Sequence, residues 1–129
     1  MDGSKDAGVA PAVISVVCLD KMHRSDGYEL LLTGERVLAA RVAQAGLVNR
    51  VVPAAELRAA TQEMALRIAN NAPLSVRASK ALVYASASLG WTEGLAEGDR
   101  LFEPVYKSQD AQEGPRAFRE KRPPRWTGR

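Results

Sequence analysis

The sequence predicts a mainly α-helical fold for this chain of 129 residues. Apolar residues recur every three or four positions over 55–70, over 74–87 and from residue 92 onward, which is the spacing of one helix face. Glycine and proline fall between these stretches, where helices commonly end. Alanine is frequent and only 5% of the residues are aromatic, so we expect a core with few large side chains. The length fits one domain at most, or part of a larger one.

The N-terminal part carries the weakest signals. Residues 1–12 are small and polar and include glycine and proline, which favours a loose lead-in. Residues 13–19 are mostly β-branched and favour one short strand. We therefore expect residues 1–27 to be a poorly defined lead-in with at most that strand, and residues 28–129 to be a helical region.

Two short helices are expected at the start of this helical region. Ser25 or Asp26 is placed to cap the first, because a side-chain oxygen at that position accepts a hydrogen bond from the first turn. Gly34 follows its end, where a left-handed residue is favoured. The second helix covers 39–45, and Gly46 with the apolar residue after it predicts a Schellman-type stop.

Three longer helices follow, over 55–70, over 74–87 and from Thr92. Thr92 is placed as the N-cap of the third, and Glu93 in its first turn is favourable against the helix dipole. Pro104 has no N–H to donate, so it interrupts the hydrogen-bond ladder and predicts a kink.

A last short helix is expected through Phe118. Asp110, with Glu113 three residues further on, has the spacing of a capping box at its start. Pro123 and Pro124 then stop the helix.

The net charge of +3 is unevenly distributed. From Arg116 onward six basic residues stand against the single acid Glu120, which gives +5 there and leaves −2 for residues 1–115. A basic segment of this kind is either a solvated tail or a surface that attracts phosphates. Nucleic-acid binding through this tail and Trp126 is disfavoured, because no reading helix or interleaved aromatic residues accompany it.

No catalytic or metal constellation is visible in the sequence. Cys18 and His23 are the only residues of their types, which gives no metal-ligand spacing and no disulfide framework. His23 is expected at a surface or a helix end. The carboxylates of the predicted helices are expected to cap helices or to face solvent. The longest apolar run, 13–19, is too short to span a bilayer. These observations favour a cytoplasmic protein with no metal and no membrane contact.

Four blocks of the sequence resemble successive C-terminal segments of the crotonase family, which comprises enoyl-CoA hydratases and isomerases. They are YELLLTG at 28–34, GLVNRVVP at 46–53, IANNAPLSVRASKALV at 68–83 and SQDAQEGPRAFREKRPPRW at 108–126. Their order and spacing match the family over about residues 24–129. The resemblance implies the helical C-terminal segment of a crotonase (ClpP/crotonase-like) fold, without the ββα spiral core.

In the family, that spiral carries the chemistry. Two backbone N–H groups polarise the thioester carbonyl, and one or two glutamates move protons or add water at the acyl C2–C3 bond. These groups precede the point where the match begins, so the resemblance implies no catalytic residue in this chain. The C-terminal segment packs on the core, builds the trimer and helps to hold coenzyme A.

Two residues carry over from the family individually. Phe102, in the pair Leu101-Phe102, matches an aromatic residue that lies against the adenine of coenzyme A. Lys121, in Glu120-Lys121-Arg122, matches a basic residue that meets the phosphates of coenzyme A, often across a subunit boundary. The alternatives are that Phe102 is a core residue of its own helix and that Lys121 is a solvated tail charge.

Two hypotheses follow. In the first, the chain is a truncated enoyl-CoA hydratase/isomerase-family protein that contributes to acyl-CoA binding and to subunit assembly, as a trimer or hexamer, and is not catalytically complete alone. In the second, it is a helical interaction module that associates with full-length crotonase-like subunits.

Overall fold

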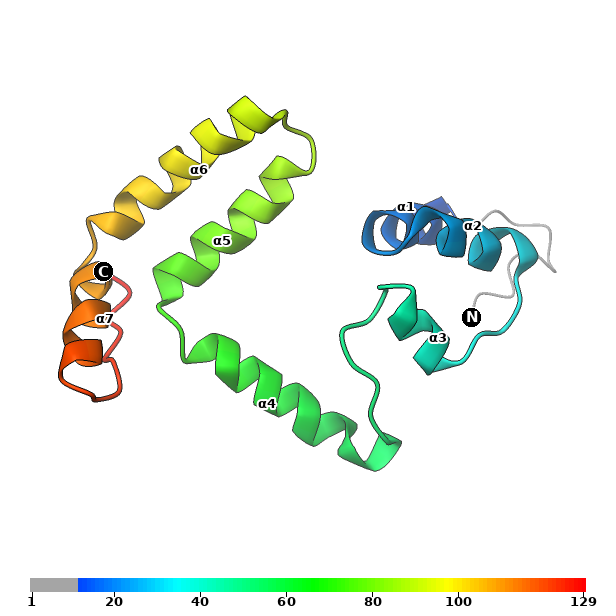
Figure 1. The fold of residues 1–129 in the computed structure, drawn as a ribbon, viewed down its shortest axis with the longest axis horizontal. Coiled ribbons are helices and arrows are strands. Elements are labelled where there is room, and N and C mark those ends of the chain that lie inside the picture. The colour runs from blue at the N-terminus through cyan, green and yellow to red at the C-terminus, as the bar shows by residue number, and fades with distance from the viewer. Residues whose placement is uncertain (1–11) are drawn as a thin grey trace. The chain divides into compact units, whose positions relative to one another are not determined.

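A computed structural model describes residues 12–129 of the chain (Figure 1). Over these residues every regular element is helical, as the sequence predicts. The chain divides into two units, one ending at Leu57 and the other covering Arg58–Arg129. Residue 27, the expected end of the N-terminal lead-in, lies inside a helix of the first unit.

The first unit contains α1 (Ala12–Lys21), α2 (Arg24–Thr33) and α3 (Ala39–Gln44). The strand expected over 13–19 is wrong, since these residues lie in α1. The preference of β-branched residues for strands is weak, and packing of α1 against α2 overrides it. Gly27 of α2 is buried at this contact, where an added Cβ would lie 2.8 Å from Leu19 Cδ2. A glycine there therefore allows α1 and α2 to approach closely.

Both glycine stops in this unit are confirmed. Gly34 and Gly46 adopt left-handed backbone angles, with φ of 71° and 89°. At the end of α3, Gly46 N donates to Ala43 O at 3.0 Å and Leu47 N donates to Val42 O at 3.2 Å. These two bonds are those of a Schellman motif.

The expected cap of α2 is wrong. The helix begins after His23, which makes no side-chain capping bond. Asp26 lies inside the first turn, and its carboxylate accepts a hydrogen bond from Arg41 Nη2 at 2.6 Å. Asp26 thus connects α2 to α3 and does not cap α2. His23 is a surface residue at a helix end, as predicted, with its side chain 76% exposed.

The second unit is built from four helices (Figure 1). After the short 3-10 turn η1 (Ala54–Glu56), α4 (Leu57–Ala69) leads into it. α5 (Pro73–Ser86) and α6 (Trp91–Tyr106) pack side by side in opposite directions, and α7 (Gln109–Arg119) follows α6.

Two helix starts in this unit differ from those expected. The N-cap of α6 is Gly90, whose N–H donates to Glu93 Oε2 at 2.9 Å, so Thr92 lies inside the helix. The N-cap of α7 is Ser108, whose Oγ accepts from Ala111 N at 3.1 Å. The capping box expected from Asp110 and Glu113 is therefore wrong, and both carboxylates are available for other contacts. Pro104 lies inside α6, which continues to Tyr106.

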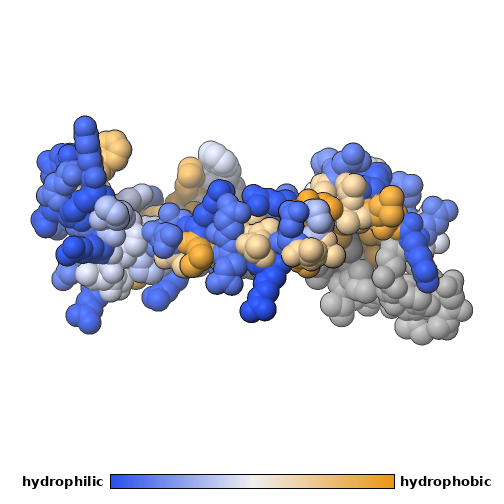
Figure 2. All heavy atoms as spheres, turned by 90° about the horizontal axis from the view of Figure 1, so that it is seen from below, coloured by the Kyte–Doolittle hydropathy of each residue, from blue (hydrophilic) through white to orange (hydrophobic). Residues whose placement is uncertain are grey.

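The buried apolar core of the described residues is small. Met22 and Ala45 are buried in the first unit, and Ala78, Val105 and Ala117 in the second. Many large apolar side chains remain exposed, including several on the face seen in Figure 2. On α4, α5 and α6 the exposed set is Leu57, Met64, Leu66, Ile68, Val83, Tyr84, Trp91, Leu95 and Tyr106.

Two searches of residues 12–129 gave negative results. None of the helices there is both long and apolar enough to cross a membrane. In the same part of the chain, no three His, Cys, Asp or Glu side chains are grouped so that they could hold a metal ion.

The α5–α6 contact predicts a difference between two chemically identical substitutions. Val105 is buried on α6 and Val83 is exposed on α5. Val105→Ala should lower the free energy of unfolding by about 1.5 kcal/mol, because it removes two buried methyl groups and leaves a cavity. Val83→Ala should change the same quantity by less than about 0.5 kcal/mol. Urea unfolding followed by circular dichroism at 222 nm measures both, and equal losses would contradict this packing.

Candidate functional site

Phe102 lies in the last turns of α6, where it is partly buried. Its ring centroid is 6.0 Å from that of Tyr106, with the ring planes tilted by 38°. The Tyr106 side chain is exposed. The end of α6 therefore presents a pair of aromatic rings, one of them open to solvent, and a flat ligand group could stack on such a surface.

Lys121 lies just beyond the end of α7, and its backbone is left-handed with a φ of 50°. It is the only residue other than glycine with a positive φ in the described part of the chain. Lys121 N donates to Phe118 O at 3.2 Å and Arg122 N donates to Ala117 O at 3.1 Å. These bonds form a Schellman motif in which lysine occupies the position that usually holds glycine. For a residue with a Cβ this conformation costs roughly 1–2 kcal/mol.

The side chains on either side of Lys121, those of Glu120 and Arg122, are paired, but that of Lys121 is not. Arg122 donates through Nη1 and Nη2 to the two carboxylate oxygens of Glu113, at 2.5 and 3.0 Å. Arg122 also donates through Nε to Glu120 Oε2 at 2.6 Å. Lys121 is exposed and forms no ion pair with the described residues. Of the run 120–122, it is therefore the residue whose charge remains available to an external anion.

The C-terminal tail, residues 120–129, is attached to α7 through its backbone. Asp110 accepts hydrogen bonds from Thr127 N at 2.7 Å, from Thr127 Oγ1 at 3.0 Å and from Gly128 N at 2.9 Å. Glu113 accepts from Arg125 N at 2.8 Å. Two carboxylates one helical turn apart on α7 thus bind the tail at two places, Glu113 at Arg125 and Asp110 at Thr127 and Gly128.

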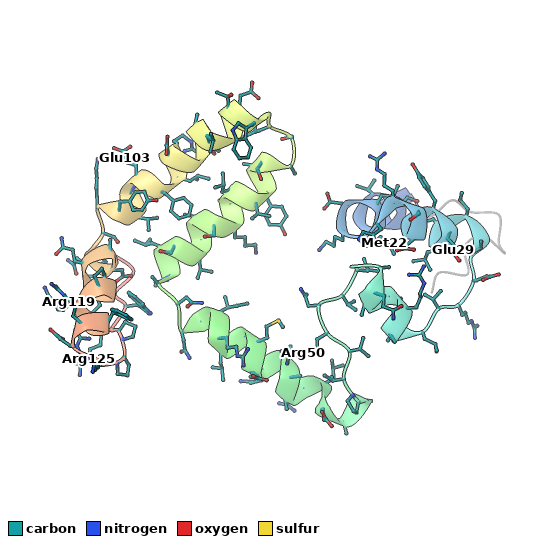
Figure 3. All side chains as sticks on the ribbon, in the orientation of Figure 1. Met22, Glu29, Arg50, Glu103, Arg119 and Arg125 are labelled. Carbon is teal, nitrogen blue, oxygen red and sulfur yellow. The ribbon has the colours of Figure 1, made fainter. Side chains whose placement is uncertain are left out.

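Trp126 attaches the same tail to the turn between α4 and α5. Its Nε1 donates to Asn70 O at 2.8 Å. An added Cβ at Gly114 would lie 3.5 Å from Trp126 Cη2, so the indole packs closely over α7 at that glycine. Figure 3 labels Arg119 and Arg125 in this region, one on α7 and the other on the tail. The tail is therefore an ordered strap across α7.

Glu113 and Asp110 are held in their ionised forms. The hydrogen bonds from Arg122 lower the pKa of Glu113 to about 2, with a further contribution from the N–H of Arg125. The backbone N–H of Thr127 lowers the pKa of Asp110, and that of Gly128 adds to the effect. Both groups line a polar cavity of about 260 Å³ between α7 and the tail.

Carboxyl groups poised as general acids have raised pKa values, which burial away from cations produces. Four carboxyl groups among the described residues show the opposite. Hydrogen bonds from arginines lower the pKa of Asp26, through Arg41, and of Glu97, through Arg100. Together with Asp110 and Glu113, every carboxyl group with a resolved shift among these residues is held ionised.

Phe102 and Lys121 are not brought together within one chain. They lie on either side of α7, which has 11 residues and so spans roughly 16 Å at a rise of 1.5 Å per residue. Lys121 follows the end of α7 that points away from α6 (Figure 1). One chain thus presents an aromatic surface and a free cation at separate places.

The sequence does not reveal which residues attach the tail to α7. Asp110 and Glu113 were assigned to a capping box, and Arg122 was counted only as part of a basic tail. One sequence feature could have indicated this attachment. Two acids lie one turn apart on a helix, and a basic, proline-rich and aromatic segment follows directly.

Residues 4–129 match the family described as enoyl-CoA hydratase/isomerase. The chain is similar to carnitinyl-CoA dehydratase of Proteus mirabilis, with 45% identity over 105 residues, which is 78% of this chain and 40% of that protein. The chain thus spans well under half the length of this curated relative.

Solved structures share the fold. An enoyl-CoA hydratase/isomerase from Mycobacterium paratuberculosis superposes with a TM-score of 0.92 and 30% identity, covering 100% of this chain and 52% of that one. An enoyl-CoA hydratase from Mycobacterium tuberculosis gives a TM-score of 0.83 and 34% identity, covering 88% and 46%. With the family matched along almost all of the sequence, and with the same helices in the same order, this chain belongs to the enoyl-CoA hydratase/isomerase (crotonase) family.

Proposed function

We propose that this chain contributes acyl-CoA binding and subunit assembly to an enzyme of the enoyl-CoA hydratase/isomerase family, and that it does not turn over substrate by itself. The observation that carries the proposal is Lys121, an unpaired cation in a left-handed conformation at the end of α7. Backbone strain of this kind is found mainly where function requires it. We place the protein in the cytoplasm, where a lone cysteine stays reduced.

Coenzyme A offers groups that suit both candidate residues. Its phosphates suit an exposed lysine, which is a mobile point charge, and its adenine suits the aromatic pair at the end of α6. Because α7 separates Phe102 from Lys121, one coenzyme A molecule would meet Phe102 of one copy and Lys121 of another. The site would then require an oligomer, in line with the trimer or hexamer that the sequence led us to expect.

The exposed apolar side chains support the assembly role. No residue of α4 is buried, and Leu57, Met64 and Ile68 stand exposed on it at the spacing of one helix face. Contiguous exposed apolar surface commonly marks an interface with another protein. The second candidate function rests on the same observation: these surfaces would be covered by a full-length crotonase-like subunit and not by another copy of this chain.

Turnover requires a carboxyl group that exchanges a proton, and the four carboxylates with lowered pKa values among the described residues do not offer one. Hydration of an enoyl thioester needs two amide donors at the thioester oxygen and a carboxyl group that exchanges a proton near neutral pH. Arginines or backbone N–H groups lower the pKa values of four carboxyl groups and hold them ionised: Asp26, Glu97, Asp110 and Glu113. We therefore assign these helices to binding and assembly.

The assembly role predicts a mass in light scattering above the 13.9 kDa of one chain. Ile68→Glu, which places a charge on the apolar side of α4, should shift the protein towards the monomer. Gln62→Glu adds the same charge to an exposed polar position of the same helix and should leave the mass unchanged. Size-exclusion chromatography with light scattering measures the mass of the protein and of both variants.

A second run of this experiment includes carnitinyl-CoA dehydratase of Proteus mirabilis as a full-length family member. Elution of the two proteins together, with this chain monomeric alone, would favour the second candidate function. A stable monomer that ignores this partner would contradict both candidates.

The binding role predicts that Lys121→Ala weakens the affinity for coenzyme A about tenfold, which corresponds to one charge-assisted contact. Arg119→Ala removes the same charge two residues away, on an unstrained position, and should have a smaller effect. Lys121→Gly should weaken binding like the alanine variant but raise the melting temperature, since glycine suits a left-handed position. Isothermal titration of the oligomer tests this, and equal losses for Lys121→Ala and Arg119→Ala would contradict it.

The catalytic part of the proposal predicts no hydration of crotonyl-CoA by the purified chain. Loss of absorbance of the conjugated thioester at 263 nm would follow the reaction. Robust hydration that survives, in part, the substitution of Asp110 and Glu113 by their amides would overturn this assignment.

A further inference from the structure

We infer that Glu113 and Arg122 are positioning residues for Lys121: their ion pair keeps Lys121 in its left-handed conformation and leaves its ammonium group unpaired for a phosphate. This inference rests on the proposed coenzyme A site. Neither Glu113 nor Arg122 needs to touch the ligand, because each acts through Lys121.

The ion pair fixes the residue that directly follows Lys121. Arg122 uses both Nη atoms on Glu113, at 2.5 and 3.0 Å, and donates from Nη1 to Pro123 O at 3.1 Å. The side chains of Arg122 and Glu113 are only 31% and 15% exposed, so solvent competes weakly for this contact. A planar guanidinium on a carboxylate fixes direction as well as distance. The backbone after Lys121 is therefore anchored to α7 at a defined orientation.

Lys121 needs such an anchor more than its neighbours do. A lysine in the left-handed region returns readily to the right-handed or extended regions when nothing opposes it. The Schellman bonds at Phe118 O and Ala117 O hold the backbone on one side. Glu113 holds it on the other, through Arg122 and through Arg125 N.

Arg122 also removes the nearest competitors for the Lys121 charge. Glu120 precedes Lys121 directly, and its Oε2 is engaged by Arg122 Nε at 2.6 Å. Glu113 is engaged by the same guanidinium. Because Arg122 engages both oxygens of Glu113 and one oxygen of Glu120, its positive charge offsets the two carboxylates nearest to Lys121. If Arg122 lost these contacts, the carboxylate of Glu120 could pair with Lys121 and neutralise its charge.

For Glu113→Gln, the positioning role and simple electrostatics predict opposite changes in the affinity for coenzyme A. A glutamine removes a negative charge near the proposed phosphate, so electrostatics alone would tighten coenzyme A binding. Positioning predicts instead that binding weakens about fivefold, because the competent left-handed population of Lys121 falls. Glu97→Gln is the matched control: it breaks the similar two-bond pair of Glu97 with Arg100 on α6 and should leave the affinity unchanged.

A double-mutant cycle measured by isothermal titration with coenzyme A shows whether Glu113 acts through Lys121. In the Lys121→Ala background, Glu113→Gln should cause no further loss of affinity. Arg122→Lys keeps the charge and loses the two-bond contact, so it should weaken coenzyme A binding about as much as Glu113→Gln does. An unchanged melting temperature of this variant would show that the tail remains folded. Tighter binding by Glu113→Gln, or an additive loss in the cycle, would overturn the inference.

The outcomes separate this inference from the proposed function. If Lys121→Ala leaves the affinity for coenzyme A unchanged, the proposed site itself is wrong. If Lys121→Ala weakens binding and Glu113→Gln does not, the site stands and the positioning role is wrong.

Discussion

The described helices bury few large apolar side chains and leave many exposed, and this imbalance constrains the rest of the structure. Among the side chains whose burial the structure describes, five apolar ones are buried, whereas each of α4, α5 and α6 exposes large aliphatic or aromatic side chains. Short helices gain most of their stability from packing an apolar face, since helix formation alone is marginal in water. The isolated helices thus need further protein surface, which the proposed assembly would provide.

Where apolar packing is thin, polar contacts hold the chain. α7 and the tail are joined by Asp110 and Glu113, whose carboxylates accept backbone N–H groups from three tail residues. Because hydrogen bonds to charged groups are stronger than those between neutral groups, a short segment with few apolar residues still adopts one path across α7. This path is what places Lys121 at the end of the helix, with its side chain exposed. The pKa of Glu113, at about 2, keeps the anchor ionised at physiological pH, so it acts as a constant support and not as a pH switch.

The sequence predicted the helices better than their ends. The helices expected over 55–70 and 74–87 and the stops at Gly34 and Gly46 are confirmed, because periodicity and left-handed glycines are local properties. The strand expected over 13–19 was wrong, since contact with α2 decided the outcome. Asp110 and Glu113 have the spacing of a capping box, and only the tail, with partners 9 to 18 residues further on, reveals their role.

The candidate site was predictable only in part. Phe102 and Lys121 came from a resemblance, which supplies residue types and not their geometry. Nothing in Glu120-Lys121-Arg122 indicates that the lysine is left-handed, because that position is usually recognised by a glycine. The pairing of Arg122 with Glu113 depends on how the tail folds back, which no local pattern encodes.

Amide hydrogen exchange along α4 tests most directly whether the exposed helices are completed by other protein surface. In the dilute monomer the amides of Leu57–Ala69 should exchange rapidly, because none of these residues is buried. In the oligomer, or with a full-length family subunit, the same amides should become protected. Strong protection in the monomer, or no change on assembly, would contradict the account.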